Sequence, residues 1–234
     1  MSQKKKERLD KLLLERGLLK SREKAKALIM GGKVWVDGNR VEKAGKEVDI
    51  HAHIVLEETR SFVGRGGLKL DGALDCFRIN VQDKIIFDVG ASTGGFTDCL
   101  LQKGAKKVYA LDVGYGLLDW SLRNDDRVVP IERKNIRYFT LDELGEKVDM
   151  SVIDVSFISL KKVIPSVIKC TKEGGTILSL VKPQFEVGKG EVGKGGIVRD
   201  PEKHKMVLDD IKRFIGTLSM EIKGSVESPI KGTK

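Results

Sequence analysis

Glycines and small residues between two aspartates give the sequence its clearest potential for ligand chemistry. Residues 84–97 read KIIFDVGASTGGFT. The apolar run Ile85–Phe87 predicts a buried strand, residues 88–95 a tight turn, and the periodic segment from Phe96 a helix. Glycine lets the backbone approach a ligand, and a helix start offers N–H groups. Asp112 follows the next apolar run, where such folds bind a ribose hydroxyl. The pattern predicts a nucleoside site, the alternative being a βα turn without a ligand.

The glycine spacing favours one nucleoside cofactor over another. Dinucleotide sites use G-x-G-x-x-G, whose second glycine lets the backbone reach a pyrophosphate. Gly90 and Gly95 fill the first and last positions, but Ser92 occupies the second. S-adenosylmethionine (SAM) has no phosphate, so the pattern favours SAM over NAD.

Asp154 and Lys182 each follow a later apolar run that predicts a strand, at residues 148–153 and 177–181. In a doubly wound sheet the first, fourth and fifth strands are adjacent, and their carboxyl ends open on one crevice. Neighbouring strands lie about 4.8 Å apart. Pro183 ends the fifth strand and holds Lys182 extended. We therefore expect Asp154 and Lys182 to meet beside the cofactor; a purely structural ion pair is the alternative.

Composition limits the class of protein. The chain has 234 residues, which exceeds the usual size of one domain. No apolar run approaches the roughly 20 residues that cross a bilayer, and the N-terminus does not lead into a signal-peptide segment. The cysteines Cys76, Cys99 and Cys170 are scattered, as are the three histidines, so we predict neither disulfides nor a metal site. The sequence predicts a cytoplasmic protein.

Positive charge is concentrated near the N-terminus. Residues 1–46 contain 14 Lys and Arg against 6 Asp and Glu, out of a net charge of +9 for the whole chain. This distribution favours contact with a polyanion over a merely solvated basic surface. Residues 4–8 predict a frayed lead-in, followed by two helices, the second capped by Ser21 and ended by two glycines. A hairpin follows over residues 34–41.

This N-terminal region resembles a known RNA-binding module. The residues from Arg8 to Ala25, together with GGKVWVDG from Gly31, are similar to the S4 RNA-binding domain over about residues 7–55. In that family two helices present basic side chains to structured RNA, mostly to phosphates. The resemblance implies RNA contacts by Arg8, Lys11, Arg22, Lys26 and Lys33.

The rest of the chain resembles the ribose 2′-O-methyltransferases related to FtsJ, and most closely the TlyA family, historically called hemolysin A. The resemblance is carried by DVGASTGGFTD from Asp88, DVSFISL from Asp154, KPQFE from Lys182 and RGGLKL from Arg65. Gly64 departs from the family, which commonly has serine there. The likeness implies an RNA contact by Arg65 and SAM binding by Asp88, Gly90, Ala91, Ser92, Thr93, Gly94, Gly95, Phe96, Asp112, Val113, Asn135, Ile136 and Asp154.

The same resemblance implies the reaction. FtsJ-like enzymes share a Lys-Asp-Lys-Glu tetrad, whose first three members correspond to Lys69, Asp154 and Lys182. Lys69 falls in the first turn of a predicted helix. Lys182 would take the proton of a ribose 2′-hydroxyl in ribosomal RNA, and Asp154 would orient it. The family's glutamate follows the segment equivalent to residues 228–232; because the chain ends at Lys234, we expect an incomplete tetrad and sheet.

These observations predict an α/β protein: a Rossmann-like class I SAM methyltransferase sheet with a small N-terminal α+β S4 domain. The predicted domains are residues 1–58 (S4), 59–64 (linker) and 65–234 (methyltransferase, C-terminally incomplete), with a helix from Pro201 and a sixth strand over residues 220–226. Ribosomal RNA or ribosomal subunits are the expected partner. The alternatives are an RNA-binding assembly factor without catalysis and, less favoured, a membrane-damaging hemolysin. A phosphate-loop NTPase is disfavoured, because Gly195 replaces the hydroxyl residue after GKGEVGK.

Overall fold

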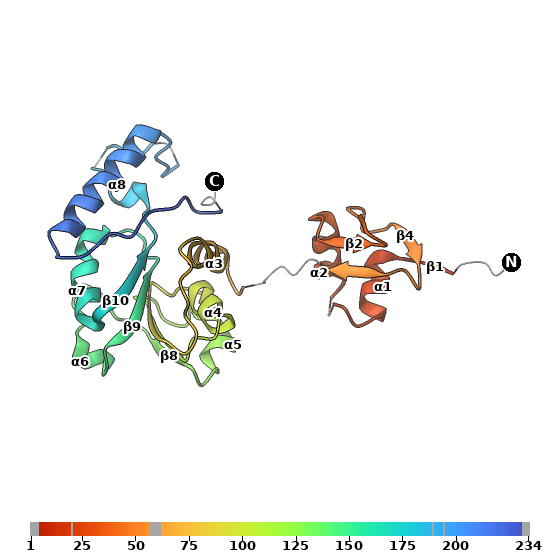
Figure 1. Ribbon diagram of the computed structural model, residues 1–234, viewed down its shortest axis with the longest axis horizontal. Helices are drawn as coiled ribbons and strands as arrows, with labels where there is room; N and C mark the ends of the chain where they lie inside the picture. The colour runs from red at the N-terminus through yellow and green to blue at the C-terminus, as the bar shows by residue number, and fades with distance from the viewer. Residues whose placement is uncertain (1–4, 20, 57–61, 189, 194, 231–234) are drawn as a thin grey trace. The chain divides into compact units, whose positions relative to one another are not determined.

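The protein consists of two compact units, residues 1–61 and 62–234, which are described separately (Figure 1). The computed structural model describes residues 5–19, 21–56, 62–188, 190–193 and 195–230. The division between the units falls within the predicted linker, of which residues 59–61 lie outside the described residues.

The N-terminal unit packs two helices against short strands. Its elements are β1 (Lys6–Arg8), α1 (Leu9–Glu15), α2 (Arg22–Met30), β2 (Val34–Val36), β3 (Asn39–Arg40), β4 (Glu47–Asp49) and β5 (Ile54–Leu56). The predicted cap on α2 is confirmed, since Ser21 accepts a hydrogen bond from the Lys24 N–H at 3.2 Å. The hairpin is confirmed as β2 paired with β3. The lead-in prediction was wrong over residues 6–8, because β1 pairs with β4 and is thereby ordered.

The second unit is built around a five-stranded parallel sheet. Its strand order is β10-β9-β6-β7-β8. The elements are α3 (Gly66–Cys76), β6 (Ile85–Val89), α4 (Gly95–Gln102), β7 (Lys107–Leu111), α5 (Trp120–Arg123), β8 (Val128–Ile131), α6 (Leu141–Leu144), β9 (Val148–Ile153), η1 (Leu160–Lys162), α7 (Ile164–Cys170), β10 (Thr171–Ser179), η2 (Pro183–Phe185) and α8 (Pro201–Gly216). The predicted adjacency of the first, fourth and fifth strands is confirmed as β6, β9 and β10.

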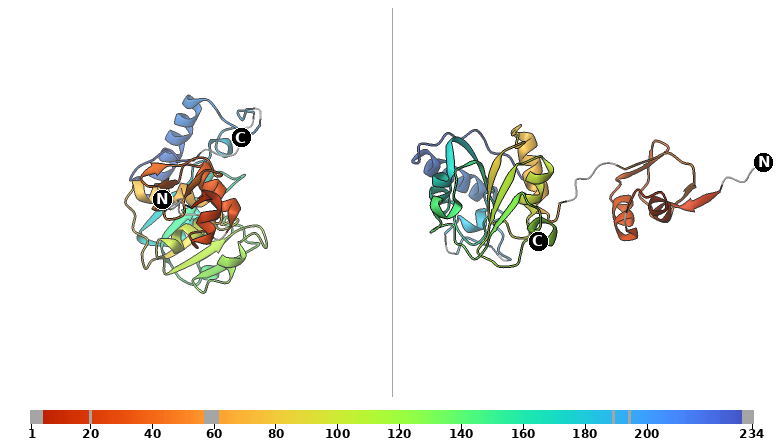
Figure 2. Two further views of the ribbon diagram at one scale, coloured as in Figure 1. Left: turned by 90° about the vertical axis from the view of Figure 1, so that its right-hand side faces the viewer. Right: turned by 90° about the horizontal axis from the view of Figure 1, so that it is seen from below.

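Helices cover both faces of this sheet, with α3 and α4 on one side and α6, α7 and α8 on the other (Figures 1 and 2). Successive residues of β6 serve the two cores in turn, as the period of a strand requires. Ile86 packs in the cluster that contains Leu70 of α3 and Leu100 of α4. Phe87 packs in the cluster that contains Val167 of α7.

The predicted sixth strand over residues 220–226 was wrong, since these residues form no strand. The segment alternates apolar and polar residues, which indicated a strand, but it runs alongside α3. A Cβ on Gly224 would lie 3.0 Å from the Phe77 ring, and one on Gly72 would lie 2.9 Å from Pro229. Among the described residues β10 pairs only with β9, so its outer edge has no strand partner.

Candidate active site

The turn between β6 and α4 brings the ends of three strands together. Gly90 has φ of +87°, and a Cβ there would lie only 2.8 Å from the carbonyl oxygen of Asp154, so the close approach of the β9 end requires glycine. Asp112, at the end of β7, accepts the Ser92 N–H with Oδ2 and the Gly114 N–H with Oδ1, both at 2.8 Å. The Asp112 carboxylate thus fixes the turn and the loop beyond β7 to each other.

Asp88, near the end of the central strand β6, is completely buried below this turn. Its Oδ2 accepts a hydrogen bond from Thr97 Oγ1 at 2.7 Å, whereas its Oδ1 has no hydrogen-bond partner among the described residues. Burial, followed by the neighbouring charges of Asp154 and Asp112, raises the pKa of Asp88 to about 7, although Thr97 opposes the shift. A buried acceptor left open in this way is suited to a ligand that carries a hydrogen-bond donor.

Lys69, Asp154 and Lys182 form a cluster of two cations around one carboxylate. Lys182 Nζ lies 2.5 Å from Asp154 Oδ1, and Lys69 Nζ lies 3.9 Å from Asp154 Oδ2. The three side chains are only 17 to 20% exposed. Lys182 Nζ also donates a hydrogen bond to Ser156 Oγ at 3.0 Å. Lys182 is extended, as predicted, and Lys69 lies in the first turn of α3.

Glycine also allows α3 to deliver Lys69 to this cluster. A Cβ on Gly95 would lie 3.0 Å from the Gly67 nitrogen, so the first turns of α3 and α4 are in backbone contact. The Val63 N–H donates a hydrogen bond to Asp98 Oδ2 at 2.8 Å, which anchors the segment before α3 to α4. Arg65, the predicted RNA contact, occupies the N-cap of α3 and is exposed.

The glycine turn and the cluster of Lys69, Asp154 and Lys182 line a cavity of about 230 Å³. Its walls are formed by Gly66, Lys69, Gly90, Ala91, Ser92, Thr93, Gly95, Phe96, Asp154, Ser156 and Lys182. A larger hollow of about 430 Å³, lined by residues 137–141 with Lys147, Ser166 and Lys169, contains none of the predicted site residues. We assign the chemistry to the smaller cavity, because only there do a glycine turn and paired charges converge.

Several predicted cofactor residues lie outside the cavity wall. Val113 is 67% exposed after β7, whereas Ile136 is 4% exposed within the core around Phe87. Asn135 Oδ1 accepts the Arg137 N–H at 3.1 Å and so closes a local turn. The structure therefore does not bring the side chains of Asn135 and Ile136 to the cavity. Conversely, Ser156 lines the cavity but was not predicted; its place two residues after Asp154 was the available signal.

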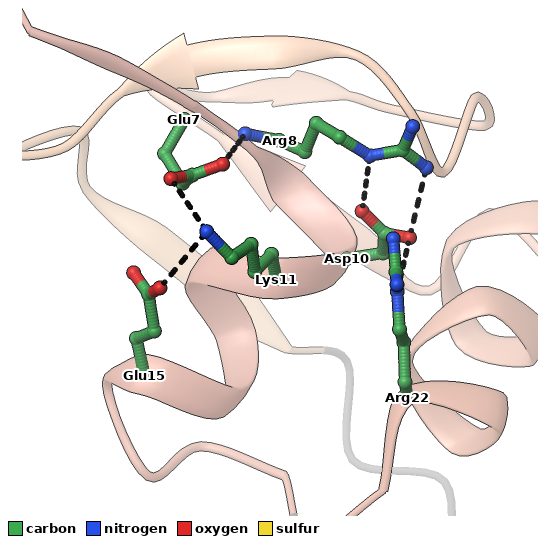
Figure 3. Close-up of polar contacts among 6 residues, drawn as sticks. All are labelled: Glu7, Arg8, Asp10, Lys11, Glu15 and Arg22. Carbon is green, nitrogen blue, oxygen red and sulfur yellow. Dashed lines mark hydrogen bonds and ion pairs between the residues drawn. The ribbon is translucent and has the colours of Figure 1, made fainter.

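In the N-terminal unit three of the five predicted RNA-binding residues contact acidic side chains. Arg8 Nε and Arg22 Nε each lie 3.0 Å from a different oxygen of Asp10, which is completely buried (Figure 3). The hydrogen bond from Arg8 and then that from Arg22 outweigh burial and lower the pKa of Asp10 to about 2. Lys11 lies 3.2 Å from Glu7 and 3.6 Å from Glu15.

The other two predicted RNA contacts of this unit are placed differently. Lys26 is exposed on α2, and Lys33 is partly buried before β2.

Among the described residues, no helix is both long enough and apolar enough to span a bilayer.

Residues 62–234 match the FtsJ-like methyltransferase family, and residues 7–54 match the S4 domain. The chain is 47% identical over 227 residues to the 16S/23S rRNA (cytidine-2'-O)-methyltransferase TlyA of Mycobacterium tuberculosis, covering 96% of this chain and 85% of the relative. It is 41% identical to Hemolysin A of Brachyspira hyodysenteriae, covering 97% and 95%. A solved structure from Streptococcus thermophilus, 44% identical, has a TM-score of 0.72 and covers 98% of this chain and 84% of that one. This chain therefore belongs to the FtsJ-like methyltransferase family and carries an N-terminal S4 domain.

Proposed function

We propose that this protein transfers a methyl group from SAM to a ribose 2′-hydroxyl of ribosomal RNA. The observation that carries the proposal is the placement of Lys69, Asp154 and Lys182 in one cavity beside the glycine turn. Membership of the FtsJ-like family and the S4 domain support a methyltransferase that acts on RNA. The relative from M. tuberculosis, named for cytidine-2′-O-methylation of 16S and 23S rRNA, supports the substrate.

The residues around the turn fit the cofactor. The glycine backbone between β6 and α4 can approach a ligand that a Cβ would exclude, and Asp88, buried behind this turn, has one carboxylate oxygen without a hydrogen-bond partner among the described residues. The cavity of about 230 Å³ lies below the usual range for ligand sites, roughly 300 Å³ and above, so we assign it to the reacting end of SAM. Asp112 and Val113, which border the turn, would hold the nucleoside. SAM, when bound, supplies a methyl group on a positively charged sulfur, which is a strong electrophile.

The protein's own contribution is alignment and movement of one proton. Lys182, deprotonated, would accept the 2′-hydroxyl proton on Nζ as the hydroxyl oxygen attacks the methyl carbon. Lys69 and Asp154 line the same cavity as this amine and place one further cation and one carboxylate beside the reacting groups. Asp154, held between the two lysines, would orient the amine. Ser156 accepts a hydrogen bond from the same amine and restricts it further.

Replacing Lys182 tests this assignment. Lys182→Ala should abolish methylation of rRNA while leaving SAM affinity, measured by titration calorimetry, close to that of the wild type. Lys182→Arg should be equally inactive, because it keeps the charge but cannot give up its proton at neutral pH. An active Arg variant would exclude Lys182 as the base. Equal losses of activity and SAM affinity would assign Lys182 to structure.

A single-turnover reaction addresses the alternative of an RNA-binding assembly factor. Enzyme in excess over rRNA, with methyl-labelled SAM, should give one labelled ribose per accepting site. Tight rRNA binding without any transfer would favour the non-catalytic alternative.

A further inference from the structure

Two loops carry the residues that we assign to chemistry, and Glu186 joins them. The first loop follows β9 and contains Asp154 and Ser156; the second follows β10 and contains Lys182. Glu186 Oε2 accepts a hydrogen bond from Ser159 Oγ at 2.6 Å, and Oε1 accepts the Leu160 N–H at 2.8 Å. Both carboxylate oxygens of Glu186 thus accept hydrogen bonds from the segment that continues the first loop.

The first loop needs such support because its backbone is strained. Phe157 has φ of +62°, a conformation that bulky side chains rarely adopt, and its ring is 91% exposed. Strain of this kind persists only where the surroundings determine the conformation. The ring of Phe157 lies 5.0 Å from the ring of Phe185, which directly precedes Glu186. Two adjacent residues of the second loop therefore contact the first loop just after Ser156, at residues 157, 159 and 160.

We propose that Glu186 is a positioning residue for catalysis, which sets the distance between Lys182 Nζ and its partners Asp154 and Ser156. This inference rests on the proposed function of Lys182. Only two residues separate Ser156 from Ser159, and only three separate Lys182 from Glu186. A displacement at the Glu186 contacts would therefore also shift Lys182 Nζ and Ser156 Oγ, which are hydrogen-bonded at 3.0 Å.

A carboxylate suits this position better than an amide. The two groups that face Glu186, a hydroxyl and a backbone N–H, both donate hydrogen bonds. Glutamine would offer one acceptor and one NH₂ donor, so Ser159 Oγ would have to accept instead of donate, and both bonds would lose the carboxylate charge that strengthens them.

Glu186→Gln should lower kcat for rRNA methylation by roughly 10- to 100-fold, because small displacements of reacting groups have effects of this size. SAM affinity and KM for rRNA should stay within about twofold of the wild type, since neither contact of Glu186 reaches the glycine turn. Ser159→Ala, a milder change that removes one donor, should lower kcat in the same direction. Adding it to Glu186→Gln should produce little further loss, because both act on one contact.

Asp149→Asn is the matched control. Asp149 is also a carboxylate that accepts a backbone N–H, from Ile85 at 2.8 Å, and a side-chain donor, Lys172. It lies where β9 and β6 begin, at the opposite ends of these strands from the candidate site. The control should lose thermal stability but keep kcat. Unchanged kcat in Glu186→Gln, or an equal fall of kcat in the control, would overturn the proposal. Inactivity of the wild type would instead overturn the proposed function.

Discussion

Asp10→Asn should destabilise the N-terminal unit. Asp10 is completely buried and contacts Arg8 and Arg22, each at 3.0 Å (Figure 3). Its pKa falls from an ordinary value of 3.8 to about 2. Each unit of that shift corresponds to about 1.4 kcal/mol. Because the two guanidinium groups are 47% exposed and partly screened by solvent, we assign about 2 kcal/mol to the charged form.

Hydrogen exchange of the full-length protein measures this loss. At pH 7 the amides of α1 and α2 that exchange through opening of this unit should exchange about 30-fold faster in Asp10→Asn. Glu15→Gln is the matched control, since Glu15 forms a surface ion pair with Lys11 at 3.6 Å, and the exchange rates of this variant should match the wild type. Wild-type rates in Asp10→Asn, or equal acceleration in the control, would refute the assignment of stability to the buried pair.

The pH dependence has a defined sign. Because the folded-state pKa of Asp10 is lowered, its stabilisation is complete above about pH 4 and is lost as pH falls through about 2. The stability difference between wild type and Asp10→Asn should therefore shrink in that interval. Urea unfolding followed by NMR signals of α1 would show it, and a difference constant down to pH 2 would contradict the reasoning.

Two further predictions concern Asp88 and Lys26. The pKa of Asp88 is raised to about 7, so the contribution of Asp88 to the free energy of unfolding declines as pH rises from about 4 to 7. Calorimetry should therefore find Asp88→Asn more heat-stable than the wild type at pH 8 but not at pH 4. Lys26 is exposed on α2, so Lys26→Gln should weaken rRNA binding and reduce the slope of log affinity against log salt by about 1, whereas an unchanged slope would exclude a phosphate contact.

The sequence predicted the sheet better than the contacts around it. Runs such as Ile85–Phe87 are apolar at every position because helices cover both faces, and this pattern predicted the class of sheet. The order of its central strands was predicted from the topology of doubly wound sheets and is confirmed. Alternation over residues 220–226 was misleading, because a strand also needs a pairing partner, and this segment pairs with no strand but packs at Gly224 against Phe77, the C-cap residue of α3. The contacts of Asp10 were not predicted from the sequence; its partner Arg22 lies twelve residues away on another helix.

In the candidate site, too, contacts between strand ends could be predicted from the sequence, whereas contacts within loops could not. Asp154 and Lys182 could be paired from sequence because each follows a strand, and the spacing of parallel strands brings their ends together. Glu186 could not be assigned its contacts, because they depend on a positive φ at Phe157 and on loop conformations that no periodicity encodes. Strand ends determine which residues meet, whereas loops determine how closely they meet. Because proton transfer is sensitive to how closely the reacting groups approach, Glu186 should be tested by mutation together with Lys182, the residue it would position.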